Sequence, residues 1–445
     1  MAGISLAKFY KPHPPLSRVG RYTYGYHRAF QFLEGIFNGI ALNSGLVYVM
    51  LRTMNVAEDD KALLSMLMGW LPSASVMTAP LWAVSQWRGT RYLSFVAIVG
   101  RVLPFSIFFF EGISPWAVVV ITTFHAWMCS GVNSASNAVF GSNYEPAERE
   151  HYYGLVKRWH IAGIIAGNTL FMSLLDPFPE LLHWIVPVSG GVGALSLYML
   201  RRPKVRRAKT PPISARMPET WPSSLSPLQW MRRGLQPFAA TARLLNRDRD
   251  FAIFELAFVI YGAAFMMLAP VIPVFYDKVF AIDLHLFSFH NVVAYYGMQF
   301  LGHILLANRL SQWKETSIML AAYLTVALYP ALLLVAWLTA PVSLNLGLGF
   351  ALAGFVIFGI GMTFLDYAWA LGPVRFARGR DALPYTSTHV MFVGVRASFA
   401  YPLSLLLMSI DRESFLLPFV VPFTWFLIAS GIAIWLKRRM VSRMI

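Results

Sequence analysis

Long apolar stretches separated by short polar ones dominate the chain. Twelve of them reach about 20 residues, the length that an α-helix needs to cross the hydrocarbon core of a bilayer. They lack the alternation of apolar and polar residues that barrel strands show, so the pattern predicts membrane-spanning helices. The predicted spans are 29–51, 62–84, 92–110, 115–139, 154–175, 181–200, 251–275, 285–307, 318–338, 345–372, 386–409 and 414–436.

Composition agrees with a helical polytopic membrane protein. Of 445 residues, 57% are hydrophobic and only 13% are charged, and the mean hydropathy is +0.55, unlike a soluble domain. The first 28 residues are basic but hold no apolar stretch, so no cleaved signal peptide is expected. The lone cysteine, Cys129, falls within the fourth span, which excludes an intrachain disulfide and a thiolate metal cluster.

Basic residues predict the orientation. Lys and Arg gather in loops on one side of the spans, and this side is cytoplasmic by the positive-inside rule, so both termini are expected in the cytoplasm. The segment 201–250 alone carries twelve Lys or Arg. The net charge of +16 therefore indicates contact with anionic lipids at that face, and no nucleic-acid partner is expected.

Weak internal repeats divide the chain into two halves. The tripeptide SQW begins at Ser85 and again at Ser311, each time between the second and third span of a half. An E-x-x-F element recurs in the first span of each half, and HAW near His125 resembles YAW near Tyr367. The predicted organisation is a basic segment 1–28, a six-helix half 29–200, a cytoplasmic linker 201–250, a six-helix half 251–436 and a basic tail 437–445.

This layout of twelve helices in two related halves resembles the major facilitator superfamily. In that superfamily the loop between helices two and three carries a Gly-x-Leu-Ala-Asp-Arg-x-Gly-Arg-like motif. The first loop here keeps Arg88, Gly89 and Arg91, but Gln86 stands where the motif has its Asp, and the second copy keeps Arg309 and Lys314. The resemblance implies two six-helix bundles that alternate access to a central site lined by helices one, four, seven and ten.

Ionisable residues within the predicted spans are the main candidates for function, because buried charges in a membrane are costly. Glu34, His125, Glu255 and Asp366 fall one to each of the four helices that the resemblance places around the cavity. A carboxyl group in a poorly hydrated cavity can exchange its proton near neutral pH, so these positions suggest proton coupling. The alternative is that the acids pair with Arg101, Arg396 or Arg158 and join helices.

Other residues add to the candidate cavity. Arg396 either binds an anionic substrate through its planar fork or neutralises a buried acid. Asn38 and Asn133 offer amides to a polar substrate or to a neighbouring helix. The aromatic candidates in cavity helices are Trp127, Tyr261 and Trp369. His160, His303 and His389 lie closer to the cytoplasmic ends of their spans and are weaker candidates.

No enzyme signature was found in the sequence, since GxSxG, HExxH, P-loop and CxxC patterns are missing. The polar stretch 145–151 holds acids and a histidine, but we interpret it as a solvated helix entrance; no metal or cofactor is expected. The predicted function is a monomeric, proton-coupled secondary transporter of the bacterial inner membrane. A transport-inactive scaffold in a membrane complex is the alternative. The substrate is open, with a slight preference for an amphipathic or weakly basic solute.

Overall fold

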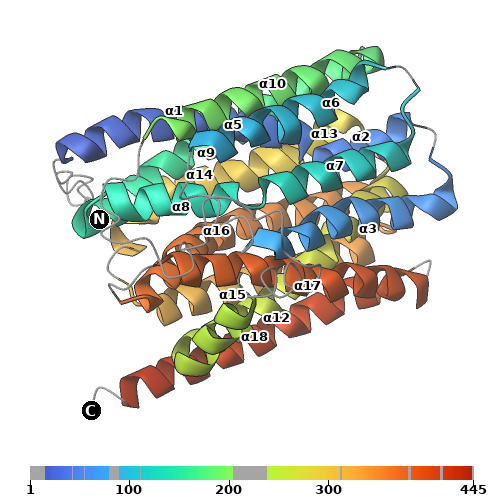
Figure 1. Cartoon of the computed structure of the whole chain (residues 1–445). Coiled ribbons are helices and arrows are strands. Elements are labelled where there is room, and N and C mark those ends of the chain that lie inside the picture. Colours follow the sequence, from blue (N-terminus) through green and yellow to red (C-terminus); the bar gives the residue numbers. More distant parts are fainter. Residues whose placement is uncertain are drawn as a thin grey trace, which may run out of the picture.

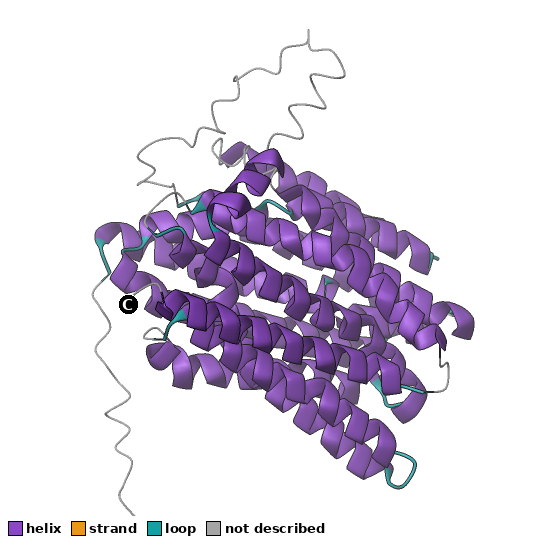
Figure 2. Cartoon of the chain, turned by 90° about the horizontal axis from the view of Figure 1, so that it is seen from below, coloured by secondary structure: helices purple, strands orange, loops and turns teal. Residues whose placement is uncertain are grey.

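The structure is a computed structural model that describes residues 16–42, 44–54, 56–79, 90–110, 112–203, 238–310, 313–378, 382–410 and 414–442. Within these ranges almost every residue is helical and none lies in a strand. The helices run roughly side by side along one direction (Figure 2). The first described helix begins, and the last one ends, at the same end of the bundle (Figure 1). We call this the termini end and the other the opposite end.

Helices lie at every predicted span, although several are interrupted. In the first part of the chain the elements are α1 (Arg18–Ala41), α2 (Ser44–Thr53), α3 (Glu58–Ser75), η2 (Val76–Thr78), α5 (Thr90–Phe95), η4 (Val96–Val102), α6 (Leu103–Ser106), η5 (Ile107–Phe109), α7 (Pro115–Cys129), α8 (Val132–Asn143), α9 (Pro146–Leu175), η6 (Pro179–Leu181) and α10 (Leu182–Arg201). Of these, η4 is π-helical.

The second part repeats the pattern after residues 238–247, which are also helical. Its elements are α12 (Arg249–Phe275), η8 (Tyr276–Phe280), α13 (Leu284–Ser288), η9 (Phe289–Ala294), α14 (Tyr295–Leu310), α15 (Glu315–Thr339), α16 (Leu344–Phe376), α17 (Leu383–Ile410) and α18 (Leu416–Ser442). Here η8 and η9 are π-helical.

Eight helical stretches of the described chain are long and apolar enough to cross a membrane, and α7 is apolar but shorter. Two of the others carry more charge. Three acids stand in the first turn of α3, and α9 holds Lys157 and Arg158 within its length. These eight stretches make the chain an integral membrane protein. They are Arg18–Thr53, Tyr92–Phe109, Pro179–Arg201, Arg249–Phe280, Glu315–Thr339, Leu344–Phe376, Pro384–Ile410 and Leu416–Ser442.

The helix ends differ from the predicted bounds where polar residues extend a helix beyond its apolar part. The Ser17 side chain accepts a hydrogen bond from the Gly20 amide, so α1 starts at Arg18 within the predicted basic segment 1–28. Asp248 similarly caps α12 by accepting from the Phe251 amide. The helices thus reach into the basic segment and into the predicted linker.

Glycines allow the closest helix contacts. A Cβ at Gly35 of α1 would lie 2.1 Å from the His160 carbonyl oxygen of α9, and a Cβ at Gly163 would lie 2.2 Å from that of Phe32. The small-residue spacing of GIIAG in α9 therefore serves packing against α1. In the second part, α12 packs on α17 and α18 as α1 packs on α9 and α10.

The two parts of the chain meet mainly through two helix pairs, α3 with α17 and α9 with α14. At the first pair, a Cβ at Gly394 of α17 would lie 2.4 Å from the Met77 amide nitrogen, so the backbones are in close contact. We call residues 18–201 the N-terminal part and residues 249–442 the C-terminal part. The charged clusters described below lie within these parts or join them.

Candidate functional site

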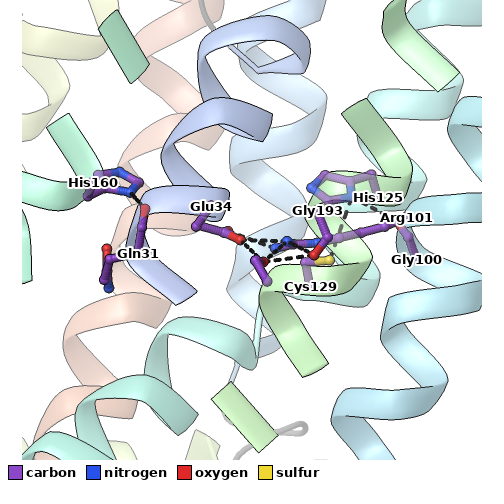
Figure 3. A network of polar contacts seen from close by, with 9 residues as sticks. Gln31, Glu34, Gly100, Arg101, His125, Cys129, His160 and Gly193 are labelled. Atoms are coloured by element: carbon purple, nitrogen blue, oxygen red, sulfur yellow. Dashed lines mark hydrogen bonds and ion pairs between the residues drawn. The ribbon is translucent and has the colours of Figure 1, made fainter. Parts of the chain in front are cut away.

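Glu34 and Arg101 form a two-pronged ion pair inside the N-terminal part (Figure 3). The Arg101 Nη1 donates to Glu34 Oε2 at 2.5 Å and its Nη2 donates to Oε1 at 2.7 Å. The same Nη1 reaches the Gly193 carbonyl at 2.6 Å, and the Ser196 hydroxyl donates to Oε2 at 2.7 Å. Arg101 is only 1% exposed. The carboxylate and guanidinium thus satisfy each other within one part of the chain.

The surroundings of this pair fit the guanidinium closely. Arg101 lies over the Phe37 ring at 4.7 Å. A Cβ at Gly193 would lie 3.1 Å from the Arg101 side chain and 2.8 Å from that ring, so a glycine leaves the space they need. His125 contacts the Gly100 carbonyl at 2.7 Å through Nδ1 (Figure 3). His125 therefore bonds to a neighbouring helix backbone.

Asp366 of α16 lies at the centre of a second cluster, and this one joins the two parts. Its Oδ2 accepts from Gln299 Nε2 at 2.6 Å and lies 2.9 Å from His303 Nε2, both on α14. Its Oδ1 lies 3.2 Å from the Lys157 ammonium of α9. Asp366 is 8% exposed. A single buried carboxylate therefore holds a cation from the other part of the chain.

Further contacts between α9 and the C-terminal part flank this carboxylate. The Tyr153 hydroxyl donates to the Asp366 carbonyl at 3.3 Å, and its ring meets that of Tyr367 at 5.7 Å. Arg158 Nη2 donates to the His303 carbonyl at 2.7 Å. Three neighbouring residues of α9 thus contact the cluster on the half of the bundle nearer the termini end.

Glu255 of α12 forms the third cluster, with His389 of α17. The His389 Nδ1 lies 3.0 and 3.1 Å from the two carboxylate oxygens. Arg396 lies further along α17 than His389 and donates instead to the Phe258 carbonyl at 2.9 Å. A Cβ at Gly262 would lie 1.9 Å from the Arg396 guanidinium, so the glycine is needed for its position. Arg396 interacts with Glu255 only electrostatically.

The two E-x-x-F elements share one arrangement. In each, the basic partner of the glutamate also contacts the phenylalanine three residues later: Arg101 at 4.7 Å from the Phe37 ring, and His389 at 4.8 Å from that of Phe258. The partners come from different helices. The repeated element therefore places an acid beside an aromatic ring in both parts, while the basic group is an arginine in one part and a histidine in the other.

Of the remaining cavity candidates, some are buried and others are exposed. Tyr261 is 2% exposed and stacks on Tyr323 at 4.9 Å, and Trp369 meets the His389 ring at 5.6 Å. Asn38 keeps its Oδ1 buried without a hydrogen-bond partner among the described residues. By contrast, Trp127 is 41% exposed and Asn133 is exposed, and neither joins one of the three clusters.

Sequence reasoning missed the partners of Asp366. Lys157 falls inside the predicted span 154–175, near its cytoplasmic end, where the positive-inside pattern groups it with the loop charges, and no local pattern marks Gln299. The usable signal was a lysine within an apolar span, because such a charge seeks a buried partner.

Most of the predicted gating loop lies outside the described residues, including Gln86, Arg88 and Gly89, and so does the side chain of Arg91. The same holds for the side chains of the polar stretch 146–151. In the second copy, Arg309 is exposed near the end of α14 and Lys314 precedes α15.

The second copy also contains an ion pair that the sequence reading missed. Glu315 accepts from Arg375 Nη1 at 2.6 Å, and the same nitrogen reaches the Trp313 carbonyl at 3.2 Å. Glu315 begins α15 and Arg375 ends α16. This pair joins two neighbouring helices of the C-terminal part at the termini end.

At the opposite end, Asp277 of η8 binds two cations from the N-terminal part. Its carboxylate lies 3.0 Å from Arg52 Nε and 2.8 Å from Lys61 Nζ. Burial alone lowers the pKa of Lys61, but hydrogen bonds to Asp277 and Glu58 raise it above its ordinary value. Nearby, the Tyr48 hydroxyl donates to the Ile282 carbonyl at 2.7 Å. We call Asp277, Arg52 and Lys61 the Asp277 clamp.

Comparison with known proteins identifies the family and the fold. Residues 30–380 match the family model of the Major Facilitator Superfamily. Among solved structures, the human organic anion transporter MFSD10 (TETRAN) is similar with a TM-score of 0.59 and 15% identity, over 93% of this chain and 99% of that one. The nucleoside transporter NupG is similar with a TM-score of 0.54 and 15% identity, over 94% and 98%. No curated protein matches the sequence. The likeness to the two structures shows the fold, and the family match covers most of the sequence: the chain belongs to the Major Facilitator Superfamily.

Proposed function

We propose that the chain is a proton-coupled secondary transporter that moves a small solute by alternating access. In this proposal two six-helix halves, 29–200 and 251–436, rock about a site between them, and both termini face the cytoplasm, with the bacterial inner membrane as the location and a monomer as the working unit. Family membership and the transporter fold support the class. The observation that carries the coupling is the ion pair between Lys157 and Asp366, which joins the halves.

Protonation of Asp366 would weaken the contact between the halves. A neutral carboxyl loses the charge that attracts Lys157 and leaves that ammonium without its counter-ion, which disfavours the closed arrangement. His303, on the other carboxylate oxygen, can exchange a proton with Asp366 across 2.9 Å. Loss of the proton restores the pair. Proton binding and closure of the termini end are thereby linked through one side chain.

Alternation needs a second contact that opens when the first one closes. The Asp277 clamp occupies the opposite end and also joins the two halves. The pKa of Lys61 in this clamp lies above the ordinary lysine value, so this cation stays charged near neutral pH. We assign it the role of the counter-gate, which is separated by the rocking motion and not by protonation.

A scaffold function is less well supported. If the chain served only as an assembly partner, each buried acid would be expected to have a permanent arginine partner. Glu34 fits this description through Arg101, but Glu255 pairs with His389 and Asp366 with Lys157 and His303. Two of the three acids therefore have partners that can gain or lose a proton, which suits transport.

The test is a pair of distance measurements in nanodiscs by double electron–electron resonance. After Cys129→Ser, spin labels are placed at exposed positions in both halves: Tyr22 and Lys437 at the termini end, Asp59 and Val342 at the opposite end. We expect acidification to lengthen the first distance and shorten the second.

In the variant Asp366→Asn, both label distances should stay, at every pH, at the values that the wild type shows at acidic pH. Its matched control is Asp250→Asn, which removes another buried acid whose partner Arg439 belongs to the same part of the chain, so its pH response should persist. Wild-type distances that do not change with pH would refute the coupling of proton binding to opening. So would an Asp366→Asn protein that responds to pH like the wild type.

A further inference from the structure

Asp366 is surrounded by tyrosines as well as by basic groups. Tyr153 of α9, Tyr261 of α12 and Tyr295 and Tyr296 of α14 all interact electrostatically with its carboxylate. The rings of Tyr295 and Tyr296 lie 4.1 Å apart. An acidic group close to several aromatic rings is a combination that recognises organic cations, because the carboxylate and the faces of such rings both attract positive charge.

The two carboxylate oxygens are used differently. Oδ2 is held by Gln299 and His303, two neighbours on α14. Oδ1 has Lys157 as its partner among the described residues, at 3.2 Å, the longest of the three contacts. The Lys157 side chain is 23% exposed, whereas that of Asp366 is 11% exposed. A flexible, partly hydrated ammonium is thus the partner of Oδ1.

We propose that Asp366 Oδ1 and the surrounding tyrosines form a binding site for an organic ammonium ion, and that Lys157 occupies this site when no ligand is bound. The ligand's charged nitrogen takes the place of the Lys157 ammonium, and its apolar part lies against the tyrosine rings. Its identity as the transported solute rests on the proposed function.

An anionic ligand is disfavoured because the two buried arginines already have partners. Arg101 is already bound through both terminal nitrogens by Glu34. Arg396 is bonded to the Phe258 carbonyl and packs against Gly262. Among the described residues no group of three acidic, histidine or cysteine side chains suits a metal ion, which prefers several oxygen ligands. The site therefore favours a singly charged organic cation.

A proton and the ligand would compete for one carboxylate. A ligand with one positive charge leaves Asp366 as a proton arrives, so charge at the site is conserved in the exchange. Other charged or titratable groups lie around Asp366: Lys157, His160 and Tyr153 from α9, His303, Tyr295 and Tyr296 from α14, and Tyr261 from α12. Arg158 acts on His303, and Tyr367 acts on Tyr153. Of these groups, the histidines can add to the response on acidification.

The experiment measures binding of benzyltrimethylammonium to the purified full chain by calorimetry. This probe keeps its charge at every pH, so any pH dependence belongs to the protein. Benzyl alcohol and benzoate are the neutral and anionic controls, and we expect both to bind at least about tenfold more weakly. Acidification should weaken binding of the probe.

Two variants separate a binding role from a structural one. Asp366→Asn should lose the probe, whereas Lys157→Met removes the internal competitor and should bind it about three- to tenfold more tightly. If both variants merely weaken binding, or if Asp366→Asn binds like the wild type, the inference is wrong. Asp250→Asn, which removes a buried acid paired with Arg439 inside the C-terminal part, should leave binding unchanged.

The outcome can be separated from that of the proposed function. Spin-label distances that respond to pH without any binding of the probe would leave proton coupling intact and overturn the cation site. Binding of the probe that tightens in Lys157→Met, without pH-dependent distances, would support the cation site and overturn proton coupling. Should Asp366→Asn fail to fold, Lys157→Met and the pH dependence of the wild type still decide the question.

Discussion

Lys157 and Asp366 approach to 3.2 Å although they belong to helices from different parts of the chain. Their contact joins α9 to α16, and the neighbouring bonds of Tyr153 and Arg158 lie beside it. In the proposed alternating-access cycle, an ion pair between the halves must break in each cycle, unlike one within a single half. The exposure of the Lys157 side chain, 23%, fits a contact that breaks.

A double-mutant cycle measures this contact. Lys157→Gln and Asp366→Asn should each lower the free energy of unfolding by about 1–3 kcal/mol, less than a fully buried pair because Lys157 is partly hydrated. The double variant should cost less than the sum, since neither partner is then left unpaired. Thermal unfolding in detergent gives the values. Additive effects would show that the two side chains are not coupled.

Arg101 and Glu34 should behave as a permanent pair. Arg101→Ala leaves a buried carboxylate without its partner and should cost about 3–5 kcal/mol. Arg101→Lys keeps the charge but loses the two-pronged geometry, so it should recover only part of the stability. Fluorescence-detected unfolding of both variants provides the comparison. A fully stable Arg101→Ala protein would contradict the role we assign to the pair.

The sequence predicts the helices well because lipid demands long apolar runs, and this requirement is local. It predicts the partners poorly. The sequence offers Arg101, Arg396 and Arg158 as partners for the buried acids, yet Glu255 pairs with His389 and Asp366 with Lys157. The pairing depends on how each helix is rotated in the bundle, which the apolar residues on all sides of a membrane helix do not reveal.

Helix ends show the same limit. The beginning of α1 is set by the Ser17 cap, within residues that composition alone assigns to a basic segment. The second SQW stretch lies just before α15, where the structure has the Glu315–Arg375 pair. The arginine partner of Glu315 lies 60 residues further along the chain, so no local pattern contains it.

Close packing of α1 on α9 provides a third prediction. Gly163→Ala places a Cβ against the Phe32 carbonyl, where backbone cannot move aside cheaply, and should destabilise the protein by about 1–3 kcal/mol. Gly25→Ala in α1, the other helix of this pair, is the matched control, because nothing lies within 4 Å of its added Cβ. Thermal unfolding of both variants decides the matter: equal midpoints would show that α1 and α9 are not in the contact described.

The Asp277 clamp gives the last prediction, because its pH behaviour differs from that of Asp366. The pKa of Lys61 is raised above its ordinary value by Asp277 and Glu58. A raised pKa means that the stabilisation is fully present below the ordinary lysine value of about 10.4 and is lost only as pH rises through the higher value in the folded protein. Near neutral pH the Lys61 contact is therefore constant.

Neutralising Asp277 should consequently open the opposite end without removing the response to protons. In Asp277→Asn, two cations lose their shared carboxylate, so the distance between labels at Asp59 and Val342 should lengthen at every pH. The pH-dependent change between Tyr22 and Lys437 should persist, because Asp366 is intact. Asp283→Asn, which alters only the cap of α13, is the control. If Asp277→Asn abolishes the pH response at the termini end, the clamp and not Asp366 is the proton-sensitive contact.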